Sequence, residues 1–285
     1  MQRRRTPAPR KNGMSVSTTT FEYLAQLVHE QSSIVLDASK DYLVESRLTP
    51  LLCAEGLTSL EELTQALRRD RYSPLHRRVV DAMTNNETWF FRDGYPFEAL
   101  RQVVLPQLLR QRETEPELSV WSAGCSSGQE IYSVAMLIRE HFPRLLNPRL
   151  TLLGTDISDV ILLRARAGRY SQWEVNRGLP AKLLCKYFDR SGADWELGRN
   201  IRDTVSFRFM NLSAPWPELP RCDVAFLRNV LIYLSLESRK KILSQLRRVL
   251  RPSGYLFLGS AESTLNLDAG YRQVAFGDGF YYQVA

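Results

Sequence analysis

Polar residues suited to holding a nucleoside follow short apolar runs at three places in the chain. The first is Gly124-Cys-Ser-Ser-Gly128-Gln-Glu130, which comes after the apolar run 118–123. A glycine turn of this kind leads from a strand into a helix, although a tight turn alone would also require Gly124. A dinucleotide fingerprint has glycine where this chain has Ser126, whose side chain obstructs a pyrophosphate. The loop therefore indicates a site for a nucleoside without phosphates.

The second and third places are Asp156, after the run 150–155, and the pair Arg228 and Asn229 inside an apolar stretch. A carboxylate at Asp156 can accept hydrogen bonds from both ribose hydroxyls of an adenosine. The alternative is that Asp156 caps the turn at Ser158. Arg228 and Asn229 would be costly in apolar surroundings, so a ligand or a local cap must satisfy them.

The elements that must position these residues alternate between strand and helix after residue 95. Apolar runs predict strands at 118–123, 150–155, 223–227 and 255–259, and helices at about 129–141, 158–166 and 236–250 fill the gaps. Two further runs, 271–276 and 280–284, flank Gly277-Asp-Gly279 and predict a terminal hairpin. The fold class is thus α/β, with a mostly parallel sheet covered by helices on both sides. Because ligands bind at the carboxyl ends of such strands, the three polar places predict one site.

Two segments depart from this alternation. Residues 18–95 read as a small all-helical domain, with predicted capping boxes at Thr19–Glu22 and Thr58–Glu61 and a helix that ends at Gly56. Pro50 is expected to kink one of these helices. The segment 168–209 is longer and more irregular than a crossover connection needs, which indicates an inserted antiparallel β subdomain. Apolar and polar residues alternate at 205–209, and we include these residues in the subdomain.

Composition excludes several classes of protein. The net charge is +7, but residues 1–17 carry five basic residues and no acid, and we expect them to form a disordered basic tail. Residues 18–95 have 8 basic and 12 acidic residues, and residues 96–285 have 25 and 19, which argues against a general polyanion binder. No apolar run is long enough to span a membrane. The four cysteines have no C-x-x-C spacing and the histidines number three, so neither a disulfide framework nor a metal site is expected, and a reducing cytosol is the natural compartment.

Four segments in order resemble the chemotaxis receptor glutamate methyltransferases, the CheR family. They are Thr84-Asn-Asn-Glu-Thr-Trp-Phe-Phe-Arg92, Trp121-Ser-Ala-Gly-Cys-Ser-Ser-Gly-Gln-Glu130, Gly154-Thr-Asp-Ile157 and Leu227-Arg-Asn-Val-Leu-Ile-Tyr233. The resemblance runs from about residue 18 to the end. It implies a class I S-adenosylmethionine-dependent methyltransferase domain of Rossmann-like fold at 96–285, with a helical domain at 18–95 and the β subdomain as an insertion.

The resemblance also implies roles for individual residues. Arg92 and Tyr233 would position the substrate carboxylate, and Glu130 and Asp156 would hold the amino-acid and ribose parts of S-adenosylmethionine respectively, or share them. Asn211 would lie by the adenine. The full set implied for the cofactor and its product S-adenosylhomocysteine is Asn86, Thr88, Arg92, Gly124, Glu130, Asp156, Asn211, Asn229 and Val230. The alternative is that Trp89, Phe90 and Phe91 only anchor the domain junction and that Arg92 forms a surface ion pair with Asp93 or Glu87.

The implied chemistry suits this residue inventory. Methyl transfer to a glutamate is a displacement at a sulfonium, and a carboxylate with a pKa near 4.3 is already ionised at neutral pH, so no general base is required. The partner implied is the cytoplasmic signalling domain of methyl-accepting chemotaxis receptors, with the enzyme a cytoplasmic monomer that is recruited to membrane receptor arrays and neither binds nucleic acid nor inserts into the membrane. Local basic groups such as Arg47, Arg77 and Arg78 would meet an acidic receptor. The alternatives are a nucleic-acid methyltransferase, and a module that binds S-adenosylmethionine and regulates a receptor with little turnover.

Overall fold

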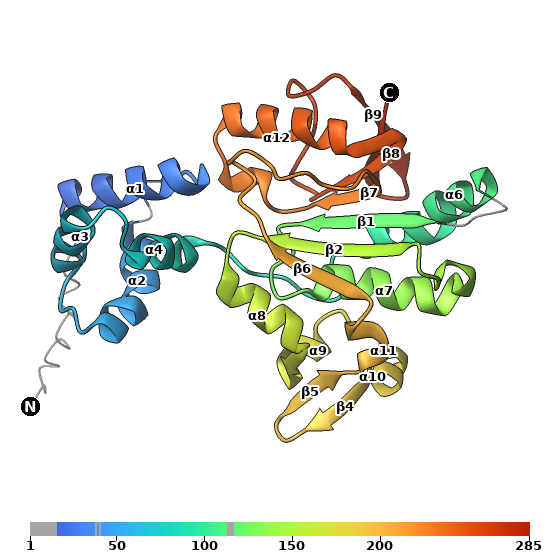
Figure 1. Cartoon of the computed structure of the whole chain (residues 1–285), viewed down its shortest axis with the longest axis horizontal. Helices are drawn as coiled ribbons and strands as arrows, with labels where there is room; N and C mark the ends of the chain where they lie inside the picture. The colour runs from blue at the N-terminus through green and yellow to red at the C-terminus, as the bar shows by residue number, and fades with distance from the viewer. Residues whose placement is uncertain (1–15, 38, 40, 113–116) are drawn as a thin grey trace, which may run out of the picture. The chain divides into compact units, whose positions relative to one another are not determined.

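The computed structural model describes residues 16–37, 39, 41–112 and 117–285, which form two compact units (Figure 1). The smaller unit comprises the described residues up to 29 and residues 36–83, and the larger unit comprises 30–35 and 84–285. Residues 84–95 thus belong to the larger unit, whereas the sequence analysis placed them with the helices. Most of the expected basic tail lies outside the described residues.

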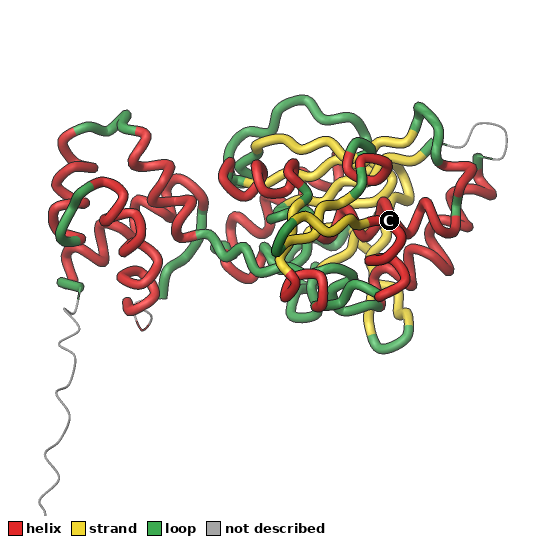
Figure 2. Tube along the Cα trace, turned by 90° about the horizontal axis from the view of Figure 1, so that it is seen from below, coloured by secondary structure: helices red, strands yellow, loops and turns green. Residues whose placement is uncertain are grey.

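The smaller unit is helical (Figure 2). Its helices are α1 (Thr18–Ser32, whose last turn belongs to the larger unit), α2 (Asp41–Glu55), α3 (Leu60–Arg69) and α4 (Pro74–Met83). Helix α2 packs against α3 and α4, and it stays one helix through Pro50. The side chains that fill the interior are apolar and recur at helical spacing, as the sequence predicts: Leu24, Val28, Val44, Leu48, Leu63, Leu67 and Val79.

Two predicted helix caps are displaced along the chain. Ser17 rather than Thr19 accepts the hydrogen bond from the first turn of α1, at 3.3 Å from the Thr20 nitrogen. Ser59 rather than Thr58 caps α3 by accepting from the Glu62 nitrogen. Neighbouring hydroxyl residues can all act as caps, so the start of a helix is decided by the register that buries its apolar face.

The larger unit is built on a seven-stranded sheet with the strand order β6-β2-β1-β7-β8-β10-β9. The five strands β6 (Val205–Phe209), β2 (Leu150–Asp156), β1 (Leu118–Ala123), β7 (Cys222–Leu227) and β8 (Leu250–Leu258) are parallel. The hairpin β9 (Tyr271–Phe276) and β10 (Gly279–Val284) continues the sheet in antiparallel fashion. The predicted fold class is confirmed.

Helices cover both faces of this sheet. On one face, α5 (Tyr95–Ala99), the π-helical turn η2 (Leu100–Val104), α6 (Leu105–Gln111), α7 (Gln129–His141) and α8 (Asp159–Ala167) pack over residues such as Val120 and Phe226. On the other face, α12 (Leu236–Val249) packs over Trp121 and Leu227. Successive residues of a strand point to opposite faces, and strands buried on both faces read as continuous apolar runs, which is why the sequence located them.

The insertion predicted between residues 168 and 209 forms a separate three-stranded antiparallel sheet, β3-β5-β4. It consists of β3 (Arg169–Ser171), α9 (Gln172–Asn176), α10 (Ala181–Tyr187), β4 (Phe188–Ser191), β5 (Asp194–Leu197) and α11 (Arg199–Arg202). The assignment of residues 205–209 to this subdomain was wrong, because they form β6, the edge strand of the main sheet, parallel to β2. Single-turn helices η3 (Pro143–Leu145) and η4 (Leu231–Tyr233) complete the unit.

Two searches of the described residues bear on function. None of the helices in these ranges is both long enough and apolar enough to cross a membrane. No group of three or more His, Cys, Asp or Glu side chains in the same ranges could hold a metal ion.

Candidate functional site

The order of the strands defines where a ligand crevice should lie. From β1 the chain passes to β2 on one side, and it later returns to β7 on the other side of β1. Strand order reverses between β1 and β7, and ligands of open α/β sheets bind outside the carboxyl ends of the strands at such a point. The two strands end at Ala123 and Leu227, so Gly124 and Arg228 are the first residues beyond them.

The turn after β1 is held by backbone hydrogen bonds. The Gly124 and Cys125 nitrogens both donate to the Thr155 carbonyl, at 2.8 and 2.9 Å. Gly124 has φ of +75°, and a Cβ there would lie 2.5 Å from the Cγ2 atom of Val230. Glycine is therefore required for two reasons, since it adopts the left-handed conformation and lets the segment after β7 approach the turn.

Asp156, the last residue of β2, joins this turn to the next helix. Its carboxylate accepts from the Ser126 nitrogen at 2.9 Å and from the Ser158 nitrogen at 3.0 Å. Ser158 itself caps α8 by accepting from the Ile161 nitrogen. Asp156 is 6% exposed. The capping alternative thus describes part of what this carboxylate does, since it bridges the glycine turn and the start of α8.

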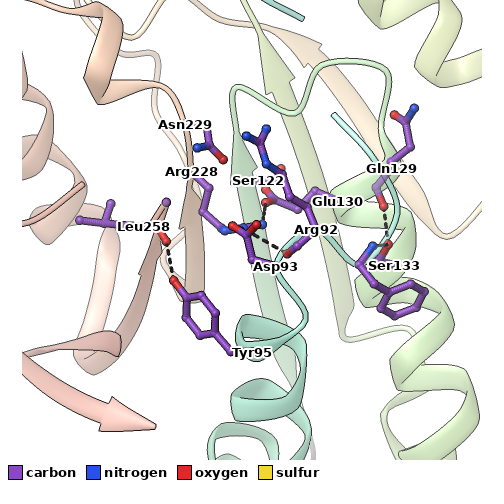
Figure 3. Close-up of polar contacts among 12 residues, drawn as sticks. Arg92, Asp93, Tyr95, Ser122, Gln129, Glu130, Ser133, Arg228, Asn229 and Leu258 are labelled. Carbon is purple, nitrogen blue, oxygen red and sulfur yellow. Dashed lines mark hydrogen bonds and ion pairs between the residues drawn. The ribbon is translucent and has the colours of Figure 1, made fainter. Parts of the chain in front are cut away.

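Arg228 lies at the centre of a buried ion cluster (Figure 3). Its side chain is 1% exposed and donates to the Glu130 carboxylate at 2.9 Å and to the Asp93 carboxylate at 2.6 Å. It also donates to the Arg92 carbonyl at 3.1 Å, and Ser122 donates to the other oxygen of Glu130 at 2.8 Å. The partner that the sequence required for Arg228 is therefore supplied by the protein itself.

Aromatic side chains fix residues 84–95 against the rest of the larger unit. Phe90 is fully buried and makes edge contacts with Tyr170 and Phe188 of the inserted subdomain, with ring centroids 5.0 and 5.6 Å apart. The Asn86 carbonyl accepts a hydrogen bond from the Ser126 hydroxyl at 2.8 Å, so this segment also contacts the glycine turn. Phe90 thus anchors this segment to the inserted subdomain within the larger unit, and the Ser126 contact places Asn86 beside the glycine turn, with the partly buried Thr88 two residues further on.

Arg92 is held without a carboxylate partner among the described residues. Its guanidinium donates to the Glu87 carbonyl at 3.0 Å and lies over the Trp89 ring, 4.2 Å from the centroid. The nearby acids are engaged elsewhere, because Asp93 pairs with Arg228 and Glu87 with Arg177. The Nε atom of Arg92 is buried and has no hydrogen-bond partner in the described ranges. The proposed ion pair with either neighbouring acid is wrong.

The segment after β7 is held by Glu262, a residue that the sequence analysis missed. The Glu262 carboxylate accepts from the backbone nitrogens of Asn229 at 2.7 Å, Val230 at 2.9 Å and Ile232 at 3.2 Å. Asn229 has φ of +59°, and its Oδ1 atom is buried with no partner among the described residues. The only sequence signal for Glu262 was an acid shortly after the strand that ends at Leu258.

Tyr233 and Asn211 complete the set of predicted site residues. The Tyr233 hydroxyl accepts a hydrogen bond from the Asn85 amide at 2.6 Å, a contact that was not foreseen. Asn211 follows β6, next to the end of β2, since the Met210 nitrogen donates to the Asp156 carbonyl at 2.8 Å. The Asn211 amide donates to the Gln31 carbonyl at 2.6 Å, and its oxygen accepts from the Ser213 nitrogen at 2.9 Å.

Burial keeps the one thiol of the site protonated. Desolvation, followed by the charges of Asp156 and Glu130, raises the pKa of Cys125 well above its usual range. A neutral thiol is a poor nucleophile, so Cys125 is a packing residue of the turn rather than a reacting group.

Comparison with known proteins decides the family. Residues 86–277 match the family described as CheR methyltransferase, SAM binding domain, and residues 19–84 match its all-alpha domain. The chain belongs to the CheR family. It is 42% identical to chemotaxis protein methyltransferase 1 of Pseudomonas aeruginosa and 40% identical to chemotaxis protein methyltransferase Cher2 of Pseudomonas putida, over 95% of this chain and 99% of each relative. A chemotaxis protein methyltransferase of Vibrio parahaemolyticus is 37% identical over 95% of this chain and 98% of its own length.

This CheR protein is therefore an S-adenosylmethionine-dependent methyltransferase of chemotaxis. The residues at the carboxyl ends of β1, β2 and β7 fit that cofactor. The Asn229 Oδ1 and Arg92 Nε atoms are buried without partners in the described part of the chain, and Asp156 places a carboxylate at the end of β2. The alternatives of a nucleic-acid methyltransferase and a regulatory module find no support in these comparisons.

Proposed function

We propose that this enzyme methylates glutamate side chains in the cytoplasmic signalling domains of methyl-accepting chemotaxis receptors, forming methyl esters that set receptor adaptation. The names of its relatives, which are chemotaxis protein methyltransferases, support a receptor as the substrate. On this proposal the protein acts as a cytoplasmic monomer and meets its substrate at membrane receptor arrays.

The cofactor is proposed to lie across the carboxyl ends of β1, β2 and β7. Asp156 would accept hydrogen bonds from the ribose hydroxyls, and Glu130, in the first turn of α7, would face the amino-acid part. Because Glu130 already accepts from Ser122 and Arg228, we expect it to contribute mainly charge. Asn211 would lie by the adenine. Asn86, Thr88, Arg92, Gly124, Asn229 and Val230 would line the remainder.

S-adenosylmethionine supplies a methyl group on a positively charged sulfur, and the acceptor carboxylate attacks that carbon. No proton has to move, since the acceptor is ionised at neutral pH. In keeping with this, none of the segments 84–92, 124–130, 156–158 and 228–233 contains a histidine. What the chain can provide is orientation of the acceptor and exclusion of water from opposite charges that cancel as the ester forms.

Arg92 is the residue best suited to orient the acceptor carboxylate. Two arginines lie at this edge of the sheet, but the charge of Arg228 is neutralised by Glu130 and Asp93, whereas that of Arg92 faces a carbonyl and an aromatic ring. A weakly held guanidinium can take up a carboxylate without breaking an existing ion pair. This difference between the two arginines is the observation that carries the proposal.

Tyr233 is proposed to contribute a second hydrogen bond to the acceptor. Its oxygen already accepts from the Asn85 amide, so its own hydroxyl proton is free to point elsewhere. A phenol that donates to one carboxylate oxygen, with Arg92 on the same group, would leave the other oxygen to attack.

Transfer of labelled methyl groups to receptor cytoplasmic fragments tests this function. We expect the incorporated label to be released by mild base, as a methyl ester is, and to be lost when the acceptor glutamates are changed to alanine. Absence of incorporation with every receptor fragment of the host would refute the proposal. Label that resists base would point to a nitrogen acceptor instead.

A further inference from the structure

We propose that Glu262 is a positioning residue for the cofactor. It would act by fixing the backbone of residues 228–235, the connection between β7 and α12, without touching the cofactor itself. This inference rests on the proposed placement of Asn229 and Val230 at the cofactor.

Glu262 binds four backbone N–H groups with one carboxylate. One oxygen accepts from Val230 at 2.9 Å and Ile232 at 3.2 Å, and the other accepts from Asn229 and Gly259 at 2.7 Å each. Three of these donors belong to the β7–α12 connection, and the fourth follows β8. Glu262 is 9% exposed, so water does not compete strongly for these contacts.

These contacts occupy all the acceptor positions of the Glu262 carboxylate. An ionised carboxylate offers about four lone-pair positions, and each oxygen of Glu262 already accepts twice. It therefore has no acceptor position left for a ligand hydroxyl or ammonium group. Its influence on the reaction must pass through the backbone that it holds.

The backbone that Glu262 holds is irregular and closely packed. Asn229 adopts φ of +59°, a left-handed conformation that asparagine takes up more often than most residues with a side chain. A Cβ at Gly259 would lie 2.8 Å from both the Glu262 Oε2 and the Asn229 Nδ2 atoms, so glycine lets the end of β8 come this close. The Glu262 contacts thus hold the connection in this conformation.

Fixing this connection also sets the width of the cofactor site. The Val230 nitrogen donates a hydrogen bond to Glu262, and its side chain packs closely against Gly124. A Cβ added at Gly124 would lie 2.5 Å from the Val230 Cγ2 atom. If the connection relaxed, Val230 and the unpartnered Asn229 Oδ1 would shift together relative to the glycine turn. A shift of this kind weakens cofactor binding before it abolishes folding.

The test compares Glu262→Gln with Asp223→Asn. Glutamine keeps one acceptor oxygen and turns an NH₂ group toward two backbone donors. Asp223 is the matched control, because it is 1% exposed and accepts from the Ser119 nitrogen at 2.9 Å and from Arg112 at 2.6 Å, but lies at the amino end of β7. Calorimetric affinity for S-adenosylhomocysteine and the melting temperature are measured for both full-length variants, together with KM for S-adenosylmethionine and kcat.

Both variants should melt at lower temperature, but only Glu262→Gln should bind poorly. We expect its Kd for S-adenosylhomocysteine to rise about tenfold, as it would if the displaced connection lost one to two hydrogen bonds to the cofactor, and its KM to change more than kcat. Glu262→Asp, which keeps the charge, should show a smaller rise, and it carries the comparison if the glutamine variant does not fold. An unchanged Kd in the Glu262 variants, or an equal loss in Asp223→Asn, would overturn the inference.

Asn229→Ala separates this inference from the proposed site. If its affinity for S-adenosylhomocysteine falls while the Glu262 variants bind normally, the site stands and the positioning role is wrong. If Asn229→Ala binds as tightly as the unchanged protein, the placement of the cofactor against this connection fails, and the role of Glu262 fails with it.

Discussion

Replacing Arg228 with methionine tests the buried ion cluster at the carboxyl ends of the strands. The Arg228 side chain is 1% exposed, and its two carboxylate partners, Glu130 and Asp93, have side chains that are 12% and 27% exposed. Methionine fills much of the same volume but leaves both acids without their cation. The substitution therefore removes the charge rather than the packing.

The expected cost follows from the burial of the partners. Removing one member of a buried ion pair typically lowers the free energy of unfolding by about 3–5 kcal/mol, because the remaining charge is poorly solvated and has no counter-charge. We expect the upper part of that range for Arg228→Met, since two carboxylates lose their partner. Adding Glu130→Gln should recover part of the loss, as the more buried of the two charges is then gone.

Urea unfolding followed by tryptophan fluorescence measures this cost. All five tryptophans lie between residues 89 and 216, so the signal reports on the larger unit. Arg101→Met is the control, because its ion pair with Glu98 is partly exposed at 36% and 49%, and such pairs contribute about 1 kcal/mol or less. If Arg228→Met costs no more than this control, or if Glu130→Gln deepens the loss, the cluster does not stabilise the fold as we reason.

Three further outcomes are expected. Asp156→Ala should chiefly raise the calorimetric Kd for S-adenosylhomocysteine, and an unchanged Kd would contradict the ribose assignment. Arg92→Ala should change this Kd less and should chiefly lower turnover in the labelled-methyl assay. Burial raises the pKa of Cys222 to about 12 and that of Cys125 well above its usual range, so a thiol reagent at pH 8 should label two cysteines in the folded protein and four in urea. Burial likewise raises the pKa of Tyr132 and Tyr170, so the folded state keeps protons that the unfolded state releases at high pH. The free energy of unfolding should therefore fall as the pH rises above about 10. In the measurement, tyrosine ionisation at 295 nm should coincide with unfolding.

Much of the fold could be predicted because its signals are local. The strand at 118–123 and the helix at 129–141 were located to the residue, since a buried apolar run and a glycine turn mark their limits. The segment 205–209 was misplaced because alternation indicates a half-buried strand but not its partner. Its pairing with β2 joins segments about fifty residues apart, and no pattern within either segment encodes it.

The site residues, too, fall into those that could be predicted from local sequence and those that could not. Residues at the carboxyl ends of strands, such as Asp156 and Asn229, could be found from the ends of the predicted strands. The partners of Arg228 could not, because Asp93 and Glu130 approach it from distant parts of the chain. Glu262 was missed for the same reason, since its four donors are backbone groups, which every residue type carries.

Pairing, more than net charge, decides which cations can act on a substrate. The surplus of +7 includes five residues of the first 17, and the most buried arginine of the site is already neutralised by two acids. Arg92 differs because its immediate contacts are a carbonyl and the Trp89 ring, which orient the guanidinium but leave its charge in place. An acceptor carboxylate would gain most from such a group when it is held loosely, because a tight ion pair would stabilise the ionised acceptor more than the transition state, in which its charge is being lost. On the proposal that the acceptor is a carboxylate, Arg92 is a cation available to it, whereas the neighbouring Arg228 is already paired with two acids.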